Sequence, residues 1–322
     1  MATTVYTFGG KVLRNGAKLC TKTITPPAPA FTVQVVTTGA ANFTVALTSP
    51  VDLLIDWGDE SSNTYNTNGS KVHSYAGAGT YVVEFTSGTA DKIAFGLDGG
   101  GNNNGNLKAV LTPVPAWLGL TSARNMFSGN WYCASFCADF FDAASANVTD
   151  FHGMLNGVGA VTTRFNEDVS GWDVSNATDL SYTFAYCYPF AGTGMSGWDV
   201  GNVTTMANML NWCYLAFNPD ISGWDTHSLT TMANMCLTCN TFNRSLAAWD
   251  VTGVTTMANF TDGAHWSTAN YSATLIGWES QAVQTGVALN VGTGKYSAGA
   301  AATARQALID DHTWTITDGG QA

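Results

Sequence analysis

Residues 217–235 read FNPDISGWDTHSLTTMANM, and the second half of this stretch recurs along the chain. The segments GWDVGNVTTMANM at 197–209 and AWDVTGVTTMANF at 248–260 differ from it at only a few positions. Four Trp-Asp pairs mark the repeat at intervals of 26, 26 and 25 residues: Trp172-Asp173, Trp198-Asp199, Trp224-Asp225 and Trp249-Asp250. Self-similarity at such a period predicts a solenoid of stacked units.

Each unit has an apolar residue at the start of its second half, and the residues three and six positions later are also apolar, apart from Thr183. The six starts are Leu120, Val148, Ala177, Val203, Leu229 and Val254. This spacing predicts a short helical turn. Segments ahead of the Trp-Asp pair, such as Asp168-Val169-Ser170 and Asp220-Ile221-Ser222, predict a brief strand. One strand and one helical turn per unit cannot bury their apolar faces alone, so the units are expected to stack.

The unit resembles the BspA-type leucine-rich repeat, which occurs mainly on bacterial surface proteins and in some viral ones. The resemblance covers roughly residues 108–320, and segments 271–278, 295–297 and 314–320 are similar to the cap that ends such arrays. It implies a leucine-rich-repeat solenoid over residues 108–265 and a C-terminal cap over residues 266–322. It also implies a binding role and no catalysis.

Ahead of the repeats, residues 31–97 read as short strands separated by turn residues, which is typical of a β-sandwich. The strands are expected at 31–36, 42–47, 51–57, 71–75, 80–86 and 92–95. The run Ile55-Asp56-Trp57-Gly58-Asp59, followed by His73-Ser74-Tyr75, resembles the PKD domain, which implies an immunoglobulin-like sandwich. Asp56, Asp59 and His73 are interpreted as turn and packing residues rather than metal ligands.

Residues 1–30 predict a small β-hairpin, because Asn15-Gly16 stands between alternating segments, and then a stiff linker at Pro26-Pro27-Ala28-Pro29. Such a module is either an anchor to a larger particle or an extra hairpin on the next domain. The expected fold class is therefore mostly β with short helices, in which an immunoglobulin-like β-sandwich is followed by a leucine-rich-repeat solenoid.

Only 11% of the 322 residues are charged, against roughly 25% in ordinary soluble domains, and the formal net charge is -11. The surface must be covered largely by neutral polar residues. No basic run offsets phosphate charge, so no nucleic-acid partner is expected. No stretch has the length needed to cross a bilayer, so no membrane insertion is expected. No motif predicts a catalytic residue, a metal site or a cofactor.

The cysteines at 20, 133, 137, 187, 213, 236 and 239 raise the question of a zinc site or a disulfide. Cys187, Cys213 and Cys239 share one repeat position and are expected to stack in the core as small apolar residues. Cys236 and Cys239 lack a further ligand pair, which argues against zinc. Whether Cys133 and Cys137 form disulfides is left open.

The aromatic residues beside these cysteines form the candidate binding site. If the cysteines point inward from an extended chain, their neighbours point outward as an aromatic strip, a surface that can stack on sugar rings or hold a protein partner. The strip comprises Trp131, Tyr132, Tyr186, Tyr188, Trp212 and Tyr214. The alternative is that these rings fill gaps between loose units. The aspartates of the Trp-Asp pairs are expected to cap the following turns rather than bind calcium.

We therefore expect a non-enzymatic protein of a phage virion surface, either a capsid decoration or a head or tail fibre component. It would bind other virion proteins through its N-terminal region and display the repeats for attachment to a host-surface glycan or protein. This expectation rests on the neutral polar composition and on a start at Met1 with no export signal. The alternative is a secreted or cell-surface bacterial adhesin. Self-association is left open.

Overall fold

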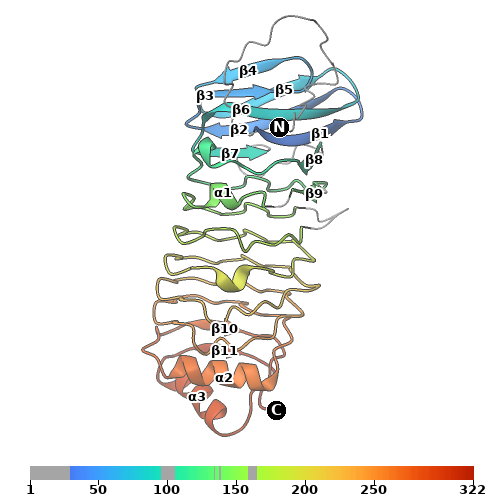
Figure 1. Ribbon diagram of the computed structural model, residues 1–322. Helices are drawn as coiled ribbons and strands as arrows, with labels where there is room; N and C mark the ends of the chain where they lie inside the picture. Colours follow the sequence, from blue (N-terminus) through green and yellow to red (C-terminus); the bar gives the residue numbers. More distant parts are fainter. Residues whose placement is uncertain (1–29, 96–105, 134, 138, 159–164) are drawn as a thin grey trace, which may run out of the picture.

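The computed structural model describes residues 30–95, 106–133, 135–137, 139–158 and 165–322. Its described part is mostly β with a few short helices, as expected from the sequence. Figure 1 shows two β-sheets at one end, a stack of coils in the middle and a pair of helices at the other end. The predicted hairpin and linker of residues 1–30 and the cysteine at position 20 fall outside the described residues, apart from Ala30.

Two sheets form the first part of the described chain. A six-stranded sheet has the order β4-β3-β6-β1-β8-β9, and a three-stranded sheet has the order β5-β2-β7. The strands are β1 (Phe31–Thr37), β2 (Ala41–Thr48), β3 (Val51–Asp56), β4 (Ser62–Tyr65), β5 (Gly69–Tyr75), β6 (Gly79–Thr89), β7 (Lys92–Phe95), β8 (Leu107–Val110) and β9 (Ser135–Phe136). All six strands predicted between residues 31 and 95 are present, but β4, β8 and β9 were not predicted.

The sheets pack face to face through phenylalanine side chains. The ring of Phe95 on β7 lies 6.0 Å from that of Phe31 and 5.9 Å from that of Phe85, both in the other sheet. All three side chains are buried. Buried and partly exposed residues alternate along the second half of β1, because one face of the strand packs against this core.

The coil stack continues directly from the two sheets. Phe95 on β7 donates its backbone N–H to the carbonyl of Met126, 2.8 Å away, and its ring stacks on Phe127 at 5.3 Å. The strand β9, which follows these residues in the chain, pairs in parallel with β8. The sheets and the coils therefore share one continuous apolar core.

The coils are joined by a column of single parallel bridges. We number the coils one to six by the bridging residues Ser122, Asp150, Asp179, Thr205, Thr231 and Thr256. Each of these residues lies two positions after a unit start inferred from the sequence, so the predicted alignment of the units is confirmed. Further backbone bonds run from each coil to the next, such as that from the N–H of Phe184 to the carbonyl of Met209, at 2.9 Å.

The prediction of one strand and one helical turn in each unit is wrong. Residues 206–212 and 232–238 form successive turns rather than a helix, and segments 168–170 and 220–222 are not strands. Met209 donates its N–H to the carbonyl of Met206, so the apolar spacing of three comes from a hydrogen-bonded turn. The described residues therefore do not form the strand-and-helix solenoid of a leucine-rich repeat. The short helices here are η1 (Ala116–Leu118), α1 (Asp142–Ser145) and η2 (Met195–Gly197).

The tryptophans of the Trp-Asp pairs form a buried column. The rings of Trp198 and Trp224 lie 6.4 Å apart and are tilted by 4°, and Trp224 lies 5.9 Å from Trp249. The indole N–H of Trp224 donates to the carbonyl of Met195 in the preceding coil, 2.9 Å away. Stacking and this bond explain why the residue recurs in every regular unit.

The aspartates of these pairs cap the turns that follow them, as expected. Asp173 accepts the backbone N–H of Ser175 at 3.0 Å, and Asp250 accepts that of Thr252 at 2.9 Å. The same bond joins Asp199 to the N–H of Gly201 and Asp225 to the N–H of His227.

The C-terminal residues cover the last coil. They comprise α2 (Thr268–Glu279), β10 (Ala288–Asn290), α3 (Ala300–Asp310) and β11 (Thr315–Thr317), where β10 and β11 pair in parallel. These elements occupy the range in which the C-terminal cap was expected. Arg305 of α3 donates to Asp318 at 2.7 Å, and Tyr271 of α2 donates to the same carboxylate at 2.9 Å. This buried carboxylate therefore joins both helices to the chain end.

Candidate functional site

The three cysteines at the shared repeat position point into the core. Cys187, Cys213 and Cys239 are fully buried and are free thiols. Each Sγ donates to a backbone carbonyl of the preceding coil, with the Sγ of Cys213 lying 3.2 Å from the oxygen of Phe184 and that of Cys239 lying 3.0 Å from the oxygen of Leu210. Burial raises the pKa of the Cys187 and Cys213 thiols well above the usual 9.0. These cysteines are packing residues, as predicted.

The aromatic residues beside these cysteines lie at the surface. Tyr186 and Trp212 are 37% and 41% exposed, and Tyr188 and Tyr214 are half-buried. The rings of Tyr186 and Trp212 lie 6.3 Å apart and are nearly parallel, at 18°. The rings of Tyr188 and Tyr214 lie 5.1 Å apart. The ring of Tyr188 is steeply tilted against that of Tyr186, and the ring of Tyr214 is steeply tilted against that of Trp212. Four rings from coils three and four therefore form one cluster.

The backbone beneath this cluster is left-handed rather than extended, which corrects the expected geometry. Tyr186 has φ 61° and Trp212 has φ 66°. Backbone bonds between coils identify the matching residues of the other coils as Gly129, Gly157, Thr238 and Gly263. Three of these four are glycines, which adopt this conformation without steric penalty. An aromatic residue there stores strain of order 1–3 kcal/mol, and such strain is concentrated at functional sites.

The two remaining predicted residues lie on the first coil. Trp131 is 50% exposed and Tyr132 is 43% exposed. The indole Nε1 of Trp131 lies 2.7 Å from the place that a Cβ on Gly157 would occupy, so this ring covers the glycine of coil two. Tyr132 lies beneath Lys108, whose Nζ is 5.0 Å from the ring centroid. Within the described residues, no ring contact links Trp131 or Tyr132 to the cluster of four.

Two buried asparagines directly precede the exposed tryptophans. Asn130 is 1% exposed and Asn211 is 6% exposed. In the described part of the chain, the side-chain Oδ1 of each has no hydrogen-bond partner. An unpaired buried acceptor costs about 1–3 kcal/mol. Each of these two exposed tryptophans therefore directly follows a buried amide whose oxygen has no partner among the described protein groups.

One apolar residue of this surface was missed. Leu215 is 44% exposed and donates its backbone N–H to the carbonyl of Tyr188 at 3.0 Å, which places it beside the cluster. It directly follows Tyr214 in the sequence, but only the contact between coils reveals its position.

The acidic and histidine residues considered in the sandwich have structural partners. Asp56 accepts the N–H of Gly58 at 2.8 Å, and Asp59 accepts both the N–H and the hydroxyl of Ser61. His73 stacks on Trp57 at 4.8 Å and lies 2.8 Å from Asp59. Their interpretation as turn and packing residues is confirmed. Across the described ranges, no group of three or more Cys, His, Asp or Glu side chains is arranged to hold a metal ion.

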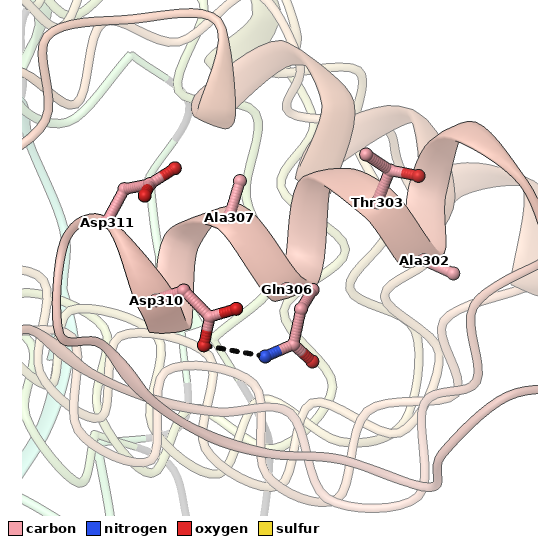
Figure 2. Close-up of a pocket in the computed structure, with 6 residues that line it drawn as sticks. All are labelled: Ala302, Thr303, Gln306, Ala307, Asp310 and Asp311. Carbon is pink, nitrogen blue, oxygen red and sulfur yellow. Dashed lines mark hydrogen bonds between the residues drawn. The ribbon is translucent and has the colours of Figure 1, made fainter.

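A depression of about 500 Å³ lies along α3 and is lined by none of the aromatic strip residues (Figure 2). Figure 2 shows that its lining comes from this helix and the residue after it, with Ala302, Ala307 and Asp311 among the lining residues and Gln306 bonded to Asp310. A shallow hollow on a single helix encloses no ligand, so the aromatic strip remains the candidate site. None of the helices in the described ranges has the length and apolar character required to cross a membrane.

Comparison with known proteins corrects the resemblance inferred from the sequence. The family model that matches is described as "Mycoplasma protein of unknown function, DUF285", and its two overlapping matches cover residues 118–210 and 155–278. This model includes none of the residues of the two-sheet region from 31 to 95. Together with the absence of strand-and-helix units among the described residues, this overturns the assignment to the BspA-type leucine-rich repeat preceded by a PKD-like domain.

No curated protein and no solved structure matches the chain. The two family matches together span residues 118–278, which is half of the sequence, and they contain all six bridged coils. The chain therefore belongs to the family described as Mycoplasma protein of unknown function, DUF285.

Proposed function

We propose that this chain is a non-enzymatic attachment protein whose coil stack presents the aromatic strip to a glycan on a cell surface. The observation that carries the proposal is the placement of Tyr186 and Trp212, two large exposed aromatic residues, at a left-handed position that is glycine in three other coils. Stability alone favours glycine there. Binding gives a reason to hold aromatic rings at this position.

A glycan suits the strip better than a protein does. Stable protein interfaces bury about 800 Å² on each partner, whereas this strip consists of a few rings with Leu215 at its edge. A pyranose ring has an apolar face of C–H groups that packs on Tyr or Trp, and its hydroxyls bond to neutral polar neighbours. The rings are also held by coils bonded to one another, so little flexibility is lost when a ligand binds.

The proposed place of the protein is the surface of a phage virion, with residues 1–30 attached to capsid or tail proteins. The sparsely charged, neutral polar composition supports display outside the cell. The second candidate is a secreted or cell-surface adhesin of a bacterium, and the family description, which refers to Mycoplasma, favours it. For the two packed sheets we propose an immunoglobulin-like sandwich that spaces the strip from its support. Neither version includes a cofactor, a metal or a nucleic-acid partner.

A binding assay on cells tests the attachment role. Fluorescent wild-type protein is compared with the Trp212→Gly variant, because glycine suits the left-handed backbone and preserves the coil. The control is Ile276→Ala, which removes a 41% exposed apolar side chain from α2 in the cap. We expect Trp212→Gly to lose at least tenfold in binding and the control to lose none. Equal binding by all three proteins would refute the role of the strip.

The location has a separate test. Mass spectrometry of purified virions, beside the washed envelope and medium of uninfected cells, shows where the native protein resides. Recovery at a fixed ratio to the major capsid protein supports the virion. Recovery from uninfected cells supports the adhesin.

A further inference from the structure

We infer that the ligand of the aromatic strip is an uncharged, linear glycan whose chain runs along the coil stack, from Trp131 toward Trp212. This inference rests on the proposed function and specifies its ligand. Three observations lead to it: the charges around the strip, the direction in which the rings follow one another, and the residues that continue the strip into coil five.

The charges exclude an acidic glycan. No Lys or Arg occurs between residues 165 and 243, the segment that carries the cluster of four rings. The acidic residues of the same segment are Glu167, Asp168, Asp173, Asp179, Asp199, Asp220 and Asp225. A uronate, sialate or phosphate group would therefore meet a segment that carries seven carboxylates and no Lys or Arg of its own. An uncharged sugar loses nothing beside these carboxylates.

Three described cations outside this segment are already engaged, and one of them, Arg124, pairs with Asp150 and Asp179. Arg244 donates to the carbonyl of Asn218 at 2.8 Å. Lys108 lies over the ring of Tyr132, where a cation–π contact holds it at the end of the strip. None of these side chains neutralises an anionic group at Tyr186 or Trp212.

The rings follow one another along the stack. Tyr186 and Trp212 occupy matching positions of coils three and four, which are joined there by the bond from the N–H of Tyr186 to the carbonyl of Asn211 at 2.7 Å. Trp131 covers Gly157, the matching residue of coil two. Adjacent coils in a parallel ladder are about 4.8 Å apart, so the three rings span about 10 Å along the stack.

The strip continues into coil five with neutral polar residues. Thr238 matches Trp212 in the backbone ladder, and Asn240 is the residue that corresponds to Tyr214. Both are partly exposed. A hydroxyl and a carboxamide donate to and accept from sugar hydroxyls without adding charge. Along the stack, coils two to four thus offer rings for stacking, and coil five offers polar groups for hydrogen bonds.

The experiment uses the cells that the wild-type protein binds. Their polysaccharide is released and separated on an anion-exchange column into an uncharged and an acidic fraction, and each fraction competes with wild-type protein for the cells. We expect the uncharged fraction to compete and the binding to be unchanged between 50 mM and 500 mM salt. Partial hydrolysis should show that competition strengthens with chain length up to a short oligosaccharide and then levels off.

The variants separate this inference from the proposed function. Thr238→Ala with Asn240→Ala should weaken binding about tenfold without changing the preference for the uncharged fraction. If the acidic fraction competes, or if only protease treatment of the cells abolishes binding, the inference is overturned although Trp212→Gly still loses binding. If Trp212→Gly binds as wild type does, the proposed function itself fails.

Discussion

Tyr186 and Trp212 lie at matching positions of consecutive coils, with their rings 6.3 Å apart and both backbones in the left-handed region. The same position is glycine in coils one, two and six. Aromatic residues here reduce stability, and the surface they create is the main candidate for selection. In the proposed attachment role, binding and stability place opposite demands on this position, and substitution of single residues can test this.

The first prediction concerns that opposition. Trp212→Gly and Trp212→Ala both remove the exposed ring, but only alanine retains a Cβ in the left-handed conformation. We expect the glycine variant to have the higher free energy of unfolding, by about 1 kcal/mol, while both lose binding equally. Chemical denaturation of the two variants measures the difference. A more stable alanine variant would show that the position is not strained.

A second prediction concerns the tryptophan column. Trp224 is 3% exposed, stacks between Trp198 and Trp249, and donates to the carbonyl of Met195. Trp224→Ala should lower the free energy of unfolding by about 3–5 kcal/mol, because it leaves a large cavity and an unpaired carbonyl. Trp224→Phe keeps a ring in the column and should cost clearly less. Similar losses for both variants would contradict the contribution of stacking.

The third prediction follows from the buried thiols. Burial holds the pKa of the Cys213 thiol well above 9.0, its usual value, so the folded chain keeps a proton that the unfolded chain releases at high pH. The stabilisation is therefore complete below pH 9 and is lost as the pH rises further. Cys213→Ala should reduce the fall in unfolding free energy above pH 9 by up to about 1.4 kcal/mol per pH unit. Denaturant titrations at pH 8, 9 and 10 measure this slope, and an unchanged slope would argue against burial of the thiol.

A fourth prediction is that the buried cysteines react slowly with thiol reagents. Cys187, Cys213, Cys236 and Cys239 should resist a thiol reagent at pH 8 in the native protein and react after unfolding. Cys137 should be the first of the described cysteines to react, because it is only partly buried whereas the others are buried. Its reaction should still be slow at pH 8, because burial raises its pKa to about 11. Mass spectrometry of the labelled peptides identifies the order. Early labelling of Cys213 would show that the coils open.

The fifth prediction concerns the cap. Asp318 is 3% exposed at its side chain, lies 2.7 Å from Arg305 and accepts the hydroxyl of Tyr271. Asp318→Asn leaves the guanidinium without its counter-charge and should cost about 3 kcal/mol. Asp310→Asn is the matched control, since that carboxylate lies exposed on α3. Thermal unfolding should separate the two variants, and equal midpoints would show that the cap does not depend on this pair.

The sequence by itself determined the period and the register of the stack. The six apolar starts predicted the bridging column position by position, because residues that repeat at the same place in consecutive coils are paired by the same backbone bonds. It also showed that the repeated cysteines pack inward, that the Trp-Asp aspartates cap turns and that most strands of residues 31–95 alternate.

Only the tertiary structure decided what each unit is made of and which rings meet. An apolar spacing of three fits a helix and a series of turns equally well, and the bonds between coils, which sequence spacing does not reveal, select the turns. The contact of Trp131 with Gly157, the pairing of β8 with β9 and the position of Leu215 beside Tyr188 all join residues that are distant in the sequence. Such contacts depend on how neighbouring coils stack, and local sequence carries no signal for them.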